Sequence, residues 1–192
     1  FRLFLFLDET FSLDIKRAKQ LCELIKQKSW HKDIEWIAAM RSELVDRQLI
    51  RVMKEAGCVG IAVGVESGDS KILEDIGKGQ ILEDARKARE FCLLEGLPIK
   101  YFLMVGLPGQ DWESISKTVQ FILDTNPTAI SCFPFTPYPG SEFWNDKRIR
   151  FESPKIYENY SNRPESHPEL RNKFVKAITN TDCMAAADIA EA

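Results

Sequence analysis

The stretch Val59–Gly68, VGIAVGVESG, joins a continuous apolar run to a carboxylate that lies between glycines. The run through Val65 predicts a β-strand covered on both faces, because it lacks the polar alternation of a half-exposed strand. Glu66 follows the run directly, at a place where burial of an unused carboxylate is costly. The stretch therefore predicts a buried strand whose carboxyl end carries a functional group.

Similar strands and intervening helices surround this stretch. Further apolar runs predict strands over Leu3–Leu7, Ile34–Ala39, Ile99–Val105 and Ala129–Phe135. Helical spacing predicts helices over Asp14–Lys28, Asp46–Ala56, Ser70–Ile76, Ile81–Glu95 and Trp112–Asp124. Asp14 is expected to cap the first helix, and Gly57 and Gly96 to end the second and fourth. This alternation predicts an α/β fold with a parallel sheet, which binds ligands at the carboxyl ends of its strands.

Composition excludes several classes of protein. The 192 residues are 44% hydrophobic and 29% charged, as expected for one domain with a substantial core. Lys plus Arg total 26 against 29 for Asp plus Glu, so the net charge of −3 provides no footprint for nucleic acid or an anionic membrane. The apolar runs are shorter than the ~20 residues that span a bilayer.

Cysteine and histidine spacing predicts no local metal site. The cysteines are separated by 36, 34, 40 and 51 residues and form no Cys-x-x-Cys pair: Cys22, Cys58, Cys92, Cys132 and Cys183. His31 and His167 are also isolated. We therefore expect buried, reduced thiols in a cytoplasmic protein.

Polar groups follow the predicted strands. Asp8 and Glu9 follow the first strand, Arg41 follows the second, and glycine-rich turns follow the later ones. Together they predict a mouth for a zwitterionic ligand with hydroxyl groups. Glu66 would accept hydrogen bonds from a ribose or an ammonium, and Arg41 would bind a carboxylate.

Each group also has a structural interpretation. Asp8 and Glu9 could cap the next helix, and Arg41 could pair with Glu43 or Asp46. The glycines could serve only as turn formers. Lys78 could point into solvent.

Seven short motifs, taken together, resemble a known family. In order they are Phe6-Leu7-Asp8-Glu9-Thr10-Phe11, Met40-Arg41, Met53-Lys54-Glu55-Ala56-Gly57-Cys58, Gly64-Val65-Glu66-Ser67-Gly68, Ile76-Gly77-Lys78-Gly79, Gly106-Leu107-Pro108-Gly109 and Pro137-Tyr138-Pro139-Gly140-Ser141. They resemble the barrel of radical S-adenosylmethionine (SAM) enzymes, closest to the branch of Fe–S oxidoreductases associated with a cobalamin-binding domain. The resemblance covers residues 1–144.

This resemblance implies a partial (β/α) TIM-like barrel of parallel strands that lacks the family's first βα unit. It implies SAM and a 4Fe–4S cluster at the mouth, with the cluster's cysteine loop upstream of Phe1 and a possible cobalamin on a separate domain. The parent enzyme would generate a 5′-deoxyadenosyl radical, and the chain alone would be inactive. A buried strand at Phe1 without a leading Met likewise predicts an excised piece.

The resemblance also implies cofactor-binding residues: Asp8, Glu9, Arg41, Glu66, Ser67, Lys78, Gly106 and Tyr138. The acidic pair would face the methionine amino group, and Glu66 would contact the ribose or the methionine end. Lys78 would pair with the methionine carboxylate, and Gly106 and Tyr138 would present backbone to the adenine. The resemblance leaves the catalytic residues unknown, and no metal ligand is expected within the chain.

Two other functions remain open. The first is a cluster-free barrel lyase that uses a lysine, for which Lys100 lies near a strand start, the wrong end for catalysis. The second is a half-barrel that binds a nucleotide without radical chemistry, although Gly106-Leu107-Pro108-Gly109 lacks the Gly-Lys-Ser/Thr of a phosphate loop.

Three expectations concern the rest of the chain and its partners. Residues 145–192 are expected to form a C-terminal helical extension packed on the barrel. The substrate is expected to be a small molecule, with no nucleic acid or membrane as partner. Self-association is expected through an exposed strand edge along Leu3–Leu7.

Overall fold

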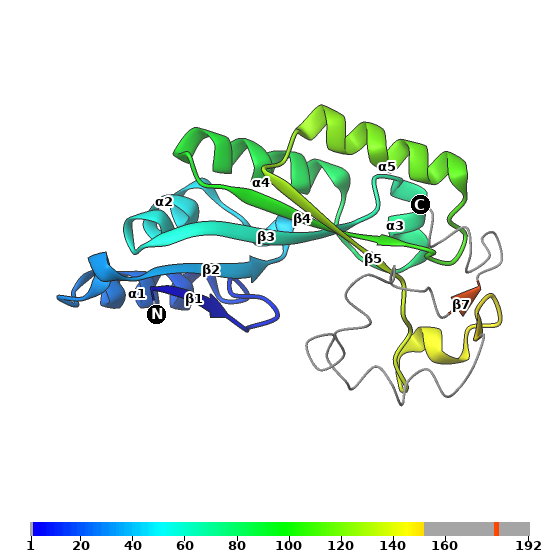
Figure 1. The fold of residues 1–192 in the computed structure, drawn as a ribbon, viewed down its shortest axis with the longest axis horizontal. Coiled ribbons are helices and arrows are strands. Elements are labelled where there is room, and N and C mark those ends of the chain that lie inside the picture. The colour runs from blue at the N-terminus through cyan, green and yellow to red at the C-terminus, as the bar shows by residue number, and fades with distance from the viewer. Residues whose placement is uncertain (1, 152–178, 181–192) are drawn as a thin grey trace, which may run out of the picture.

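Five parallel strands form one curved sheet in the order β1-β2-β3-β4-β5, shown in Figure 1. They are β1 (Leu3–Phe6), β2 (Glu35–Met40), β3 (Cys58–Glu66), β4 (Ile99–Val105) and β5 (Ala129–Pro134). The computed structural model describes residues 2–151 and 179–180. The curled sheet is a half-barrel, which confirms the predicted partial TIM-like barrel of parallel strands.

Helices connect the strands as predicted. They are α1 (Ile15–Lys26), α2 (Arg47–Glu55), α3 (Ser70–Asp75), α4 (Leu82–Glu95) and α5 (Trp112–Thr125), with short 3₁₀ turns at η1 (His31–Asp33), η2 (Ser42–Leu44) and η3 (Glu142–Asn145). Asp14 caps α1 by accepting a 3.0 Å hydrogen bond from the Arg17 amide. Gly57 and Gly96 adopt φ of +92° and +63° after α2 and α4, as expected of helix-ending glycines.

The helices cover only the outer face of the sheet. Trp36 and Met40 on β2 and Tyr101 on β4 are buried in the main core beneath α1, α2 and α4. The alternate residues face inward and are only half-buried, as Lys100 and Phe102 show. The prediction that every strand is covered on both faces was therefore wrong, because a half-barrel leaves its concave side open.

A second, smaller core lies beyond the carboxyl ends of the strands. Ile72, Leu107, Phe135 and Ile149 are buried together there, with Phe143 packed against them. This cluster joins the loops after β4 and β5 to the segment around η3. The segment thus closes one side of the half-barrel's mouth.

Most of the expected C-terminal extension lies outside the described residues. Within it, β6 (Arg150–Phe151) pairs antiparallel with β7 (Thr179–Asn180). The part of the expected helical extension after Phe151 lies outside the described residues, apart from the two residues of β7.

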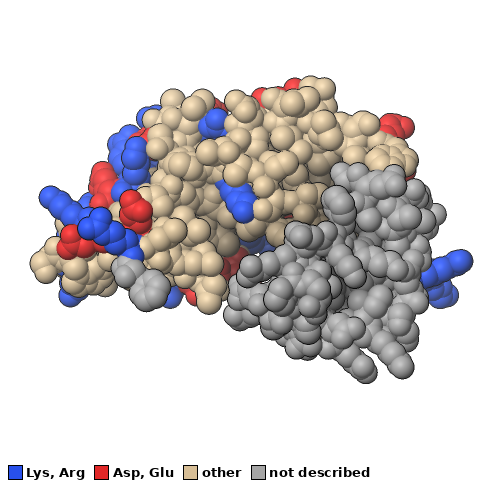
Figure 2. Space-filling view, viewed as in Figure 1, with Lys and Arg blue, Asp and Glu red and all other residues tan. Residues whose placement is uncertain are grey.

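The surface is unevenly charged. In Figure 2, charged residues gather at the left end, near the starts of β2 and β3, and the middle of this face carries few. No helix in the described part of the chain is both long and apolar enough to cross a membrane.

Candidate cofactor-binding site

The end of β3 departs from regular strand geometry at Glu66. The register between β3 and β4 shifts between Gly64 and Glu66, and Glu66 adopts a φ of +65°. A side chain at positive φ costs about 1–3 kcal/mol and persists only where its surroundings enforce it. Such strain is typical of functional sites, and here it aims a carboxylate at the mouth of the half-barrel.

Glu66 forms an ion pair with Lys78. The Lys78 Nζ atom lies 2.5 Å from Glu66 Oε1, with the side chains 24% and 10% exposed. A Cβ atom on Gly64 would lie 2.5 Å from the same oxygen and 3.1 Å from Nζ. The pair therefore occupies the space that a side chain at position 64 would need.

Arg41 lies beside this pair. Its Nη2 atom donates a 3.3 Å hydrogen bond to the Lys78 carbonyl, and its Nε atom pairs with Glu43. The pairing with Glu43 that the sequence left open is thus present. Asp46 instead binds Lys19 at 3.2 Å and caps α2.

Two residues that were not predicted from the sequence connect the Lys78 loop to the strand ends by hydrogen bonds. Gln80 is buried, and its Nε2 atom donates to the Gly64 carbonyl at 2.7 Å. The buried Ser42 hydroxyl donates to Gln80 Oε1 at 3.2 Å. Gln80 thus links η2, the end of β3 and the loop that carries Lys78.

Ser67 lies fully buried beneath the mouth. Its hydroxyl lies 3.3 Å from the Thr118 hydroxyl and accepts a 3.1 Å hydrogen bond from the Asp69 amide. The Gly68 amide also donates to Thr118, at 2.9 Å. These contacts shape the turn after Glu66.

Asp69, the cap of α3, anchors the same turn to α5. Burial favours a higher pKa for its carboxyl group. The Lys117 ammonium at 3.0 Å and the backbone amides of Lys71 and Ile72 outweigh burial and hold the pKa below its usual range. The turn is therefore held by a charged group that stays ionised at neutral pH.

The loop after β4 has its own internal support. Gly106 adopts a φ of +81°, and its amide donates to Gln110 Oε1 at 2.7 Å. Gln110 is completely buried and, like Gln80, was not predicted from the sequence. Tyr138, in the loop after β5, is 61% exposed, and its carbonyl accepts from the Ser141 amide and hydroxyl.

Asp8 and Glu9 lie exposed after β1. They do not cap α1, because Asp14 fills that role. Of the eight residues predicted to bind cofactor, the structure brings Arg41, Glu66 and Lys78 into one contact cluster. An uncharged amide such as Gln80 gives little signal in sequence, apart from its place directly after the Gly77-Lys78-Gly79 motif.

The cysteines that the structure describes form no ligand set for an iron–sulfur cluster. Cys22, Cys58 and Cys92 are buried, and burial raises the pKa of each thiol to about 12. A 4Fe–4S cluster needs several thiolates that meet at one place. Among the described residues, no three His, Cys, Asp or Glu side chains come together as metal ligands.

Known protein families and relatives resemble this chain. The family model described as "Radical SAM superfamily" matches residues 1–122. A relative named "Uncharacterized methyltransferase PH0819", from Pyrococcus horikoshii, is 34% identical over 143 residues, which are 72% of this chain and 30% of the relative. The chain thus spans less than a third of that relative's length.

Solved structures share the fold. TsrM from Kitasatospora setae, a radical SAM methyltransferase with cobalamin and a [4Fe-4S] cluster bound, matches with a TM-score of 0.63 and 19% identity over 69% of this chain and 25% of TsrM. The same enzyme with tryptophan substrate and aza-SAM, a SAM analogue, matches with a TM-score of 0.61 and 20% identity over 67% of this chain and 26% of that one. Both likenesses are those of the half-barrel.

Proposed function

This chain belongs to the radical SAM superfamily, and from that membership we propose that it binds SAM at the carboxyl ends of its strands. The proposed cofactor-binding core is residues 1–144 of a radical enzyme. The observation that carries the proposal is the cluster of Glu66, Lys78 and Arg41 at the end of β3.

The charges of this cluster suit SAM. The cofactor presents a ribose diol and a methionine group with one ammonium and one carboxylate. The Glu66 carboxylate would accept from the diol or the ammonium, and the Lys78 and Arg41 cations would face the methionine carboxylate. Each charge-assisted hydrogen bond contributes about 1.5–3 kcal/mol.

In the proposed radical chemistry, the residues of this chain bind SAM and orient it. The Glu66–Lys78 pair keeps both charges in place without a ligand, and Gln80 holds the loop that carries Lys78. When SAM binds, Glu66 and Lys78 would exchange their contact with each other for contacts with the charged groups of SAM. This exchange limits the free-energy cost of removing either side chain from water. When bound, SAM supplies the sulfonium centre on which the family's radical chemistry depends.

Further cofactors belong to the proposal for the whole enzyme. The described residues offer no ligand set for a 4Fe–4S cluster, so its ligands would come from elsewhere in the enzyme. Cobalamin, bound in TsrM, would likewise occupy another domain. We place the enzyme in the cytoplasm because its separated cysteines suit a reducing compartment. The proposed substrate is a small molecule, and family membership favours radical chemistry over a lysine-based lyase or a non-catalytic nucleotide binder.

Titration of the ¹⁵N-labelled chain with SAM, followed by amide NMR shifts, tests the proposal. The amides of Gly64, Glu66 and Gly106 should shift, and those of Gly57 and Gly96 at the opposite end should not. Glu66→Ala should weaken SAM binding about 10- to 100-fold, since ~1.4 kcal/mol is a factor of ten.

The matched control is Glu90→Ala, because Glu90 is exposed on α4 away from the mouth. Glu90→Ala should bind SAM like the wild type. Unchanged affinity in a folded Glu66→Ala protein would refute the site.

A further inference from the structure

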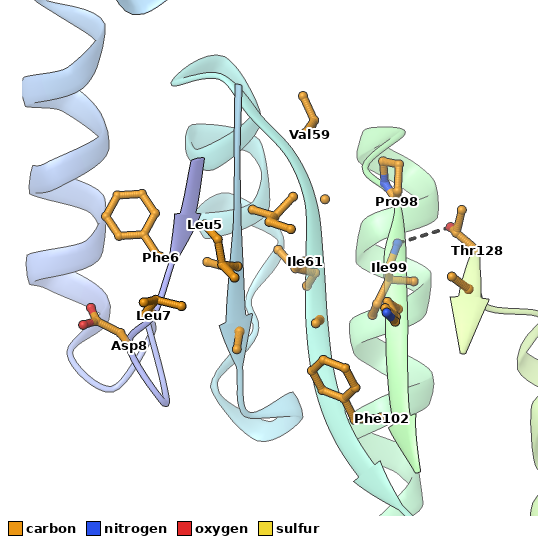
Figure 3. Close-up of a pocket in the computed structure, with 17 residues that line it drawn as sticks. Leu5, Phe6, Leu7, Asp8, Val59, Ile61, Pro98, Ile99, Phe102 and Thr128 are labelled. Atoms are coloured by element: carbon orange, nitrogen blue, oxygen red, sulfur yellow. Dashed lines mark hydrogen bonds between the residues drawn. The ribbon is translucent and has the colours of Figure 1, made fainter. Parts of the chain in front are cut away.

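The concave face of the half-barrel holds a cavity below the proposed SAM site. Its volume is about 540 Å³, within the range of small-molecule sites. Inward-facing residues of all five strands line it, among them Leu5, Ala39, Ala62, Lys100 and Ala129. Figure 3 shows Leu5, Ile61, Ile99 and Phe102 distributed around it.

Small residues on the inner strands keep this cavity open. Ala39, Gly60 and Ala62 present no side chain longer than a methyl group toward it. The walls are apolar, formed by Leu5 and Leu7 on one side and Phe102 on the other. An apolar ligand would therefore gain from transfer out of water.

Lys100 places a positive charge within these apolar walls. It is half-buried, and its Nζ atom lies 5.4 Å from the centre of the Phe102 ring. No ion pair joins it to any other residue that the structure describes. Asp8, the other charged residue lining the cavity, lies beyond the end of β1, on the side of α1 in Figure 3. Lys100 is thus a cation in an apolar site that has no counter-charge among the residues that the structure describes.

The strand register sets the distance from Lys100 to the proposed SAM site. Lys100 pairs with Ala62, and Glu66 pairs with Leu103, so the two levels differ by three residues of β4. At ~3.3 Å per residue, this separation is about 10 Å. A ligand anchored at Lys100 would reach the level of Glu66 with its opposite end.

We propose that this cavity binds the substrate, an apolar small molecule with one anionic group that pairs with Lys100 and a reacting end about 10 Å away, toward Glu66. The identification of this ligand as the substrate rests on the proposed function. Lys100 acts in binding and orientation, which fits its place near the start of β4, away from the reacting end of the barrel.

Two fluorescent probes with the same aromatic skeleton test the proposal on the full chain. The anionic probe is 8-anilinonaphthalene-1-sulfonate, and the neutral probe is N-phenyl-1-naphthylamine. Lys100→Met, which keeps an apolar stem, should weaken the anionic probe at least 10-fold and change the neutral probe less than 2-fold. Lys100→Arg should restore most of the affinity for the anionic probe.

Further variants locate the site. Ala62→Leu should weaken both probes by filling the cavity, whereas Lys87→Met, on the exposed side of α4, should change neither. Melting curves of each variant identify any that is unfolded. Equal affinity of the anionic probe for wild type and Lys100→Met would overturn the proposal. Equal affinity of both probes for wild type and Ala62→Leu would overturn it as well.

The SAM titration separates this inference from the proposed function. Lys100→Met should bind SAM like the wild type. Absence of SAM binding in the wild type would refute the proposed function and, with it, the identification of the ligand as the substrate. Weaker binding of the anionic probe to Lys100→Met would still establish the cavity as a binding site for anionic ligands.

Discussion

Oε1 of Glu66 and Nζ of Lys78 meet at 2.5 Å directly over Gly64, where the first atom of any other side chain would lie. The ion pair can therefore form in this position only because residue 64 on β3 has no side chain. Both partners are far ends of long side chains and can move without the backbone. A substitution at position 64 thus acts on the site more than on the fold.

Gly64→Ala should displace the Glu66–Lys78 pair and weaken SAM binding at least 10-fold, with little change in melting temperature. Its Cβ would lie 2.5 Å from Glu66 Oε1, which is far too close. Gly60→Ala is the matched control, because its Cβ would come no closer than 3.4 Å to any atom. Calorimetric titration and melting curves on both variants measure the difference, and equal SAM affinities would argue against it.

Glu66→Gly should be more stable than Glu66→Ala by about 1 kcal/mol in free energy of unfolding. Both variants lose the carboxylate, but only glycine adopts the observed φ of +65° without strain. Urea denaturation of the two proteins measures the difference. Equal stability would mean that position 66 relaxes out of the left-handed region once the carboxylate is removed.

Protonation of Glu95 should destabilise the fold at acid pH. Hydrogen bonds from Arg51, and then from Arg47, lower the pKa of Glu95 to about 2. The folded pKa lies below the unfolded value of about 4.3, so the stabilisation is complete above pH ~4.3 and decreases as the pH falls toward 2.

Glu95→Gln should therefore lower stability at pH 7 and flatten the loss of stability between pH 5 and 2. Urea denaturation across that range measures the slope, with Glu90→Gln on the same helix as control. A variant with the wild-type slope would show that this ion cluster contributes nothing to the pH dependence.

Cys22, Cys58 and Cys92 should resist alkylation in the folded chain. Each is buried, and burial raises the pKa of each thiol to about 12. Cys132 on β5 is exposed by surface area, and burial raises the pKa of its thiol by less than in these three. Iodoacetamide at pH 8, with mass spectrometry of each cysteine peptide, should modify Cys132 about 100-fold faster than these three. The difference in alkylation rate should disappear in urea. Rapid alkylation of Cys22, Cys58 or Cys92 in the folded chain would show that the core between the sheet and the helices opens locally.

Self-association through β1 remains a prediction. Within the described sheet β1 is an edge strand, and Leu3 and Leu5 are each 57% exposed. Light scattering should show assemblies that Leu3→Lys disperses, since a charge on an edge strand opposes pairing. Leu24→Lys, at an equally exposed site on α1, should leave them intact, and a monomeric wild type at high concentration would contradict the prediction.

Local sequence patterns determined most of the fold prediction. The run Ile99–Val105 became β4 residue for residue, because its apolar pattern and flanking residues suffice to define a strand. The expected cover on both faces of the strands failed for a non-local reason. The inner face of a barrel is covered only when enough strands close around it. An apolar run such as that of β3 has the same sequence pattern in a closed barrel and in a half-barrel.

Only the charged residues of the site could be predicted from the sequence. Arg41, Glu66 and Lys78 follow strand or loop signals, and the structure brings them into contact. Gln80 and Gln110 were missed because a buried amide acts through its partners, and those partners are set by tertiary structure. The left-handed backbone at Glu66 was missed for the same reason, since it depends on the shift in register against β4.

The two faces of each strand divide the molecule in a way that bears on its evolution. On β4, Tyr101 and Leu103 belong to the core beneath the helices, whereas Lys100 and Phe102 face the cavity. Substitution of the inward set removes few contacts from that core, so its cost in stability should be small. A lineage of such half-barrels can therefore exchange one ligand preference for another, one residue at a time, without passing through unfolded intermediates.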